Sequence, residues 1–226
     1  MAVTPEFLSA LLAIIVIDLA LAGDNAIVIA LAARNLPSHQ RRLAIIWGTV
    51  GAIVVRCAMT LAVVWLLGIP GLMAAGGAVL VYIAYKLMRP QQGDGHDVKA
   101  AATFWGAMQT IVIADAAMGL DNVLAVAGAS HGSFTLVVLG LVISVPIVVW
   151  GSQLILKWIE RYPWIVHVGV AVLAYTAAHM VVGEPLFQPF FAANAVLKFL
   201  VYAGVIGGVF LAGFLSQRRR PVAAGA

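Results

Sequence analysis

The stretch IVIDLALAGDNAIVIALA, residues 15–32, decides how this chain folds, because it places two carboxylates inside an apolar run of membrane-spanning length. A second stretch, VIADAAMGLDNVLAVAGA at residues 112–129, repeats the pattern. The polar residues of the two copies are Asp18, Asp24 and Asn25, and Asp115, Asp121 and Asn122. A carboxylate at the bilayer centre opposes insertion by about 2.5–3.5 kcal/mol, so four of them require a bound cation or bound protons as compensation.

The composition excludes an ordinary soluble domain. Of 226 residues, 63% are hydrophobic and only 10% are charged, with a mean hydropathy of +1.05, whereas soluble domains carry about 25% charged residues. A membrane span needs about 20 apolar residues. Seven stretches meet this need, at about 6–33, 42–67, 69–89, 101–129, 134–156, 163–182 and 194–215. We therefore predict an all-α polytopic membrane protein with seven transmembrane helices in a single domain covering residues 1–226.

Little chain remains outside the predicted spans, so neither an enzyme nor a nucleic-acid-binding domain is expected. The net charge of +4 is then interpreted through the placement of the basic residues, which indicates the orientation of the chain in the membrane. Basic residues follow the first, third, fifth and seventh stretches: Arg34, Arg41 and Arg42; Lys86, Arg89 and Lys99; Lys157 and Arg161; and Arg218, Arg219 and Arg220. The turns after the second and fourth stretches carry none. The positive-inside rule therefore predicts an outside N-terminus and a cytoplasmic C-terminus.

The duplicated motif predicts an internal repeat. Residues 78–82 (AVLVY) in the third stretch also parallel residues 171–175 (AVLAY) in the sixth. Repeat 1 then covers about 6–89 and repeat 2 about 101–182, with a cytoplasmic loop at about 90–100 and an extra helix at about 194–215. Three spans per copy would insert the second copy upside down, which is the inverted-repeat arrangement of many secondary transporters.

The two motif helices together predict a cation site. Residues six apart on a straight helix differ by about 9 Å along its axis, too far for both carboxylates to hold one ion at about 2.0–2.6 Å. If the first and fourth spans cross antiparallel, Asp18 lies level with Asp121 and Asn122, and Asp115 lies level with Asp24 and Asn25. Two acidic stations result, or one merged site if the helices unwind at Gly23 and Gly119. Close helix packing is the competing reason for these glycines.

Carboxylate and amide oxygens suit Mg²⁺, Ca²⁺ or Mn²⁺, whereas copper and zinc favour the Cys and His that both motifs lack. Two alternatives stay open: aspartates that are protonated and hydrogen-bonded between helices, and a pathway for protons alone. Arg56, in the second span, is a candidate counterion for the acidic cluster when no metal is bound; the alternative is that it snorkels or forms a structural ion pair. Five further polar residues would line a path or hydrogen-bond across helices: Gln109, Thr110, Ser144, Thr176 and Asn194.

The segments DLALAGDNAIVIA and ADAAMGLDNVLAVAGAS closely resemble the paired motifs of TerC-type integral membrane proteins, and in particular the short YjbE-like subfamily. The resemblance covers nearly the whole chain. It implies a bacterial inner-membrane protein of the LysE-like transporter superfamily, whose TerC members are associated with manganese export and tellurium resistance. Carried onto this sequence, it assigns the metal site to Asp18, Asp24, Asn25, Asp115, Asp121 and Asn122.

We therefore expect a secondary transporter that exports a divalent metal, Mn²⁺ first, by alternating access with proton antiport. Its partners would be the cation, protons and the lipid bilayer, with no tightly bound cofactor; a homo-oligomer is compatible with the sequence. The alternative is a membrane accessory protein that supplies metal to secreted enzymes or organises a resistance complex.

Overall fold

The computed structural model describes residues 5–20, 22–66, 69–88, 98–130 and 133–218, and within them every regular element is an α-helix. The helices are α1 (Pro5–Ala20), α2 (Ala22–Ala33), α3 (Ser38–Leu61), α4 (Val63–Leu66), α5 (Leu72–Met88), α6 (Val98–Ala129), α7 (Phe134–Arg161), α8 (Ile165–Gly183), α9 (Gln188–Ala192) and α10 (Ala195–Arg218). The all-α prediction is confirmed. Most of the predicted 90–100 loop lies outside the described residues.

Four helices are by themselves long and apolar enough to cross a membrane: α3, α7, α8 and α10. The pair α1 and α2 makes a fifth candidate if it is one bent span. Helix α5 and the apolar part of α6, Phe104–Leu120, are shorter apolar helices. Each of the seven predicted stretches thus coincides with one or two helices, while the count of seven spans and the orientation remain predictions.

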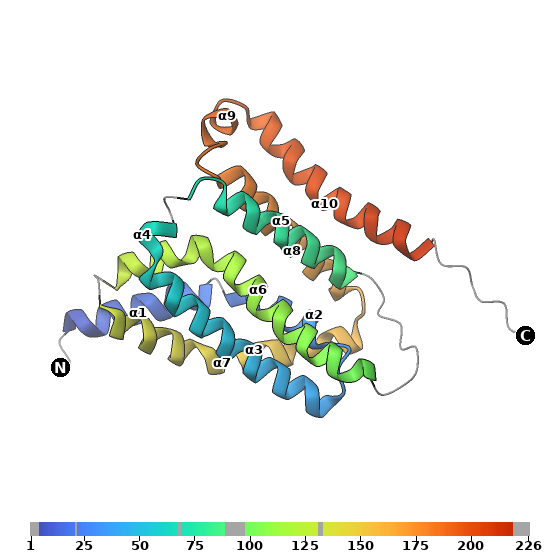
Figure 1. Ribbon diagram of the computed structural model, residues 1–226, viewed down its shortest axis with the longest axis horizontal. Helices are drawn as coiled ribbons and strands as arrows, with labels where there is room; N and C mark the ends of the chain where they lie inside the picture. Colours follow the sequence, from blue (N-terminus) through green and yellow to red (C-terminus); the bar gives the residue numbers. More distant parts are fainter. Residues whose placement is uncertain (1–4, 21, 67–68, 89–97, 131–132, 219–226) are drawn as a thin grey trace, which may run out of the picture.

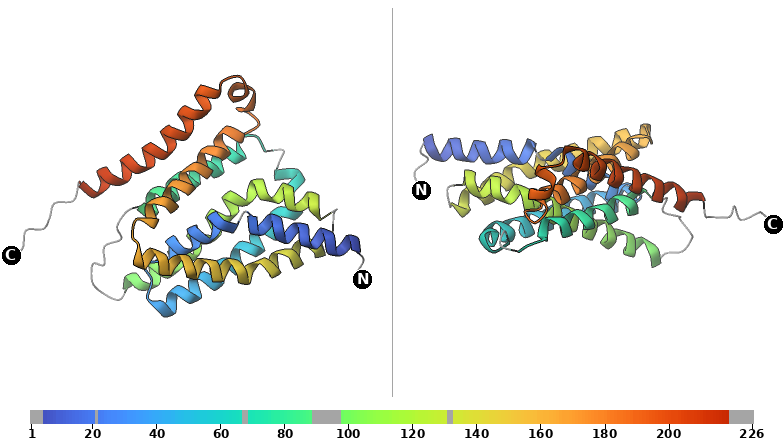
Figure 2. Two further views of the ribbon diagram at one scale, coloured as in Figure 1. Left: turned by 180° about the vertical axis from the view of Figure 1, so that it is seen from behind. Right: turned by 90° about the horizontal axis from the view of Figure 1, so that it is seen from above.

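The helices pack in an arrangement that two halves of the chain share (Figures 1 and 2). Helix α3 packs on α6, as α7 packs on α1 and α2; α5 packs on α6, as α8 packs on α2; and α5 and α8 pack on each other. Exchanging the two predicted repeats leaves this set of pairs unchanged. Helix α10 stands outside it, at the edge of the molecule against α5 and α8. Large apolar side chains such as Trp65 (80% exposed) cover the exterior, as a lipid-facing surface requires.

The first motif lies at a helix break and the second does not. Helix α1 ends at Ala20 and α2 begins at Ala22, and the axes of Pro5–Leu19 and Gly23–Ala33 differ by 49°. A Cβ on Gly23 would meet no atom within 4 Å, so close packing does not explain this glycine. Helix α6, in contrast, continues through Gly119. The alternative in which the helix unwinds at Gly119 is therefore not met: Gly119 is buried and lies against Arg56, whose Nε would be 3.8 Å from an added Cβ.

Helices α5 and α8 approach closely at Gly77. A Cβ there would lie 2.7 Å from the main-chain oxygen of Ala177, which cannot move aside as a flexible side chain can. We expect Gly77→Ala to lower the unfolding free energy by about 1–3 kcal/mol through overpacking. Thermal unfolding of detergent-solubilised protein measures this. Gly204→Ala, on α10 with open space around the added Cβ, is the matched control; equal unfolding temperatures for the two variants would contradict the expected close approach.

The N-terminus of α5 is capped by a residue that directly follows another helix. Glu184, directly after α8 and only 1% exposed, accepts hydrogen bonds from the main-chain N–H groups of Gly71 (2.9 Å), Met73 (3.1 Å) and Ala74 (3.2 Å). These donors belong to the first turn of α5 and the residue before it, where no intrahelical acceptor exists. Gly71 has a φ of +82°, which favours glycine at this turn. The carboxylate thus fixes α5 to the end of α8.

The Glu184 cap predicts acid sensitivity. Burial acts to raise the pKa of Glu184, but the surrounding main-chain N–H groups outweigh it and hold the pKa below its usual value. A depressed carboxyl pKa stabilises the fold above the unfolded value near 4.5 and loses this effect as pH falls through the folded pKa. We expect Glu184→Gln to cost about 2 kcal/mol at neutral pH. The unfolding temperatures of Glu184→Gln and wild type, measured between pH 7 and pH 3, should converge at the acid end. A difference that stays constant with pH would contradict the cap.

Candidate cation site

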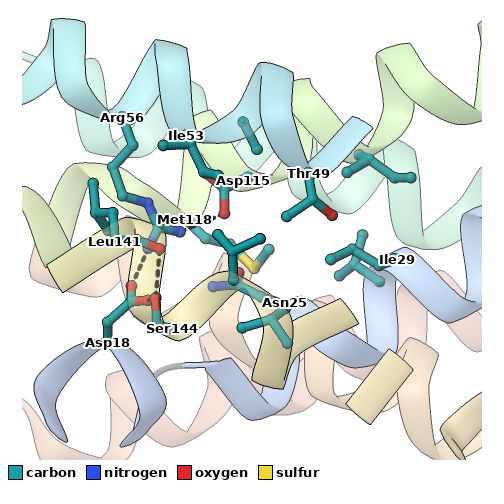
Figure 3. A pocket seen from close by; sticks show the side chains of 15 residues that line it. Asp18, Asn25, Ile29, Thr49, Ile53, Arg56, Asp115, Met118, Leu141 and Ser144 are labelled. Atoms are coloured by element: carbon teal, nitrogen blue, oxygen red, sulfur yellow. Dashed lines mark hydrogen bonds and ion pairs between the residues drawn. The ribbon is translucent and has the colours of Figure 1, made fainter. Parts of the chain in front are cut away.

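A small cavity lies where α1, α2, α3, α6 and α7 meet. Its volume is about 40 Å³, which is room for more than one water-sized group. Polar side chains from each of these helices line it among apolar ones: Asp18, Asn25, Thr49, Arg56, Asp115 and Ser144 (Figure 3). The cavity therefore lies at the junction of the two motif-bearing segments.

One end of the cavity is held by an ion-pair network centred on Arg56. Its guanidinium donates from Nη1 to Oδ1 of Asp18 and from Nη2 to Oδ1 of Asp115. The Arg56 and Asp18 side chains are each only 6% exposed. Ser144 donates to the second oxygen of Asp18, so both oxygens of this carboxylate are occupied. The prediction that Arg56 is a counterion of the acidic cluster is thereby confirmed.

Three side-chain oxygens at the cavity lack a hydrogen-bond partner among the described residues. Oδ2 of Asp115, Oδ1 of Asn25 and Oγ1 of Thr49 are buried and accept or donate no hydrogen bond within the described part of the chain. Asn25 and Thr49 are each 5% exposed. A buried polar atom left unpaired costs about 1–3 kcal/mol, so three of them around one cavity indicate a bound species that supplies the missing contacts. Figure 3 shows Asn25 and Thr49 on the side of the cavity away from Asp18 and Ser144.

The six predicted metal ligands divide into three groups. Asp18, Asn25 and Asp115 line the cavity, whereas Asp24 and Asn122 do not. Asp24 lies in the first turn of α2 and accepts a hydrogen bond from the main-chain N–H of Asn25 (2.8 Å), in the position where a helix dipole favours a negative charge. Asp121 belongs to α6, but its side chain lies outside the described part of the structure.

The predicted antiparallel arrangement assigns Asp18 and Asp115 to different stations, but a single guanidinium bonds both. This contact fits the alternative of one merged site, which the sequence left open. Asn25 and Asp115, which the antiparallel arrangement assigns to one station, line the same cavity.

Thr49 was not predicted as a site residue. It is an isolated hydroxyl in an apolar helix, where threonine ordinarily bonds its own backbone; Thr110 does so, donating to the carbonyl of Gly106. What sets Thr49 apart is its buried hydroxyl without a partner, which only the packing reveals.

The cavity offers mostly neutral oxygen ligands. Within the described residues, no three His, Cys, Asp or Glu side chains come close enough to share one metal ion. One free carboxylate oxygen, an amide and a hydroxyl form a hard-oxygen set that suits Mg²⁺, Ca²⁺ or Mn²⁺, with water completing the shell. So few charged ligands would bind weakly, as suits an ion that enters and leaves.

Comparison with known proteins settles the family. Residues 3–220 match the model of the Integral membrane protein TerC family. The chain belongs to the TerC family. YjbE of Bacillus subtilis (strain 168), described as an uncharacterized membrane protein, is 45% identical over 213 residues, covering 94% of this chain and 97% of the relative. The match to the TerC family confirms the resemblance seen in the paired motifs.

Two further relatives are less similar and are covered over less of their length. YkoY of the same Bacillus strain, also an uncharacterized membrane protein, is 26% identical over 234 residues, covering 90% of this chain and 70% of the relative. The UPF0053 protein YegH of Escherichia coli (strain K12) is 25% identical over 181 residues, covering 72% of this chain but 34% of YegH. No solved structure matches the chain significantly.

Proposed function

We propose that this TerC protein is a secondary transporter that exports a divalent metal ion, with Mn²⁺ as the leading substrate, across a bacterial inner membrane. The observation that carries the proposal is the set of three buried, unpartnered oxygens on Asp115, Asn25 and Thr49 around one cavity. Their chemistry favours a hard divalent cation, and their place between the two motif-bearing segments fits a transport path.

The ligands we propose are Oδ2 of Asp115, Oδ1 of Asn25 and Oγ1 of Thr49. Asp18 anchors Arg56 in this arrangement, because both of its oxygens are occupied. Asp24, Asp121 and Asn122 belong to the same motifs, and we assign them to binding during the passage of the ion to or from the cavity.

Export needs an energy source. Moving a divalent cation out of a negative interior costs about 4.6 kcal/mol per 100 mV, so a carrier for metal alone would favour import. The sequence contains no GxxxxGK[ST] motif for nucleotide binding. We therefore propose proton antiport as the coupling.

Flux of Mn²⁺ into proteoliposomes, with and without an imposed pH gradient, tests the proposal. We expect gradient-dependent flux in wild type and a drop of at least tenfold in Asp24→Asn and in Asp121→Asn, one variant for each motif. Ca²⁺ and Mg²⁺ in competition define the selectivity. Mn²⁺ flux that does not depend on the imposed pH gradient would contradict the proposed proton antiport. Well-folded wild type without flux of any of the three ions would favour the accessory role instead.

A further inference from the structure

The most unusual feature of the cavity is a permanent cation inside it. Arg56 lies on α3, is 5% exposed, and reaches between the two motif segments to pair with one carboxylate from each: Asp18 on α1 and Asp115 on α6. An arginine cannot be deprotonated in proteins. A buried positive charge in a site that attracts cations competes with the cargo, so it needs a function of its own.

The carboxylates of Asp18 and Asp115 differ in the number of oxygens that remain without a partner. Asp18 gives one oxygen to Arg56 and the other to Ser144. Asp115 gives one oxygen to Arg56 and keeps Oδ2 unpartnered in the cavity that Asn25 and Thr49 also line. A metal ion in the cavity would therefore share Asp115 with the guanidinium, while Asp18 would hold the guanidinium from the far side.

Resting on the proposed transport function, we propose that Arg56 acts as a tethered substitute for the cargo: it neutralises the carboxylates of the metal-free site and gives up part of its hold on Asp115 when a divalent cation binds. The three charged groups that form the network carry one net negative charge with Arg56 and two without it. A buried carboxylate without a partner is energetically costly in a low-dielectric interior, so it opposes a change of conformation in which it stays buried. Arg56 thus enables the metal-free protein to reorient and collect the next ion.

Two flux assays separate this function from metal binding. In Mn²⁺–Mn²⁺ exchange, with the ion on both sides of the liposome membrane, only the metal-loaded protein has to reorient. In net flux, with the ion on one side and equal pH on both, the metal-free protein must also return. We expect Arg56→Gln to lower net flux at least tenfold relative to wild type and to change exchange by less than threefold. An equal fall in both assays, or unchanged net flux, would overturn the proposal.

A charge-balanced variant keeps the test valid if Arg56→Gln does not fold. Asp18→Asn combined with Arg56→Gln removes the anchor carboxylate together with the arginine and restores one net negative charge. The ratio of net flux to exchange in this double variant should lie within threefold of wild type. A ratio more than tenfold lower would show that the guanidinium itself, and not its charge, is required. That result would refute the proposal that Arg56 substitutes for the transported ion.

The two proposals fail in different ways. Wild type that carries neither Mn²⁺, Ca²⁺ nor Mg²⁺ in exchange or net flux would refute transport, and the Arg56 proposal with it. Wild type that exchanges Mn²⁺, with Arg56→Gln impaired equally in both assays, would refute the Arg56 proposal alone.

Discussion

Replacing Asp115 with asparagine should lower the affinity for Mn²⁺ at least a hundredfold. Asp115 Oδ2 is the only unpartnered carboxylate oxygen among the described residues that line the cavity, and the other two proposed ligands, Asn25 and Thr49, are neutral. Asparagine keeps the size and one carbonyl oxygen but removes the charge that attracts a divalent ion. Isothermal titration of the protein in lipid nanodiscs with Mn²⁺ measures the change.

Asp18→Asn is the matched control for this experiment. It removes the same charge from the same network, but from a carboxylate whose oxygens are both already bonded. We expect its loss of affinity to stay below tenfold. Equal losses in the two variants would contradict the division of functions between a ligand carboxylate and an anchor carboxylate.

The second large effect is on stability. Arg56→Gln leaves Asp18 and Asp115 buried without their common partner, and breaking a buried ion pair on one side costs about 3–5 kcal/mol. We expect the unfolding temperature to fall accordingly in a fluorescence-based thermal assay. Adding Asp18→Asn removes one of the two stranded charges and should recover part of the loss. Additive losses in the double variant would contradict a coupled network.

Much of the fold could be predicted from the sequence because bilayer thickness sets the length of apolar runs. Within the described residues, each of the seven apolar stretches coincides with one or two helices. The motifs also indicated which segments build the cavity, since buried carboxylates in an apolar run need a partner. The candidate counterion Arg56 followed from the same charge argument, and the structure pairs it with Asp18 and Asp115.

Other features depend on packing that no local pattern encodes. Glycine permits a helix break without requiring one, so Gly23 lies beside a break while Gly119 continues a helix against Arg56. That Asp18 and Asp115 share the Arg56 guanidinium depends on how α1, α3 and α6 pack together. Thr49 became a candidate ligand only because its neighbours leave its hydroxyl unpaired.

The most direct test of the central claim is to locate the ion. Crystals of wild-type protein soaked in Mn²⁺ should give an anomalous scattering peak in the cavity, within about 2.0–2.6 Å of Asp115 Oδ2, Asn25 Oδ1 and Thr49 Oγ1. A peak at another position under saturating Mn²⁺, or a cavity that holds only water, would contradict the account.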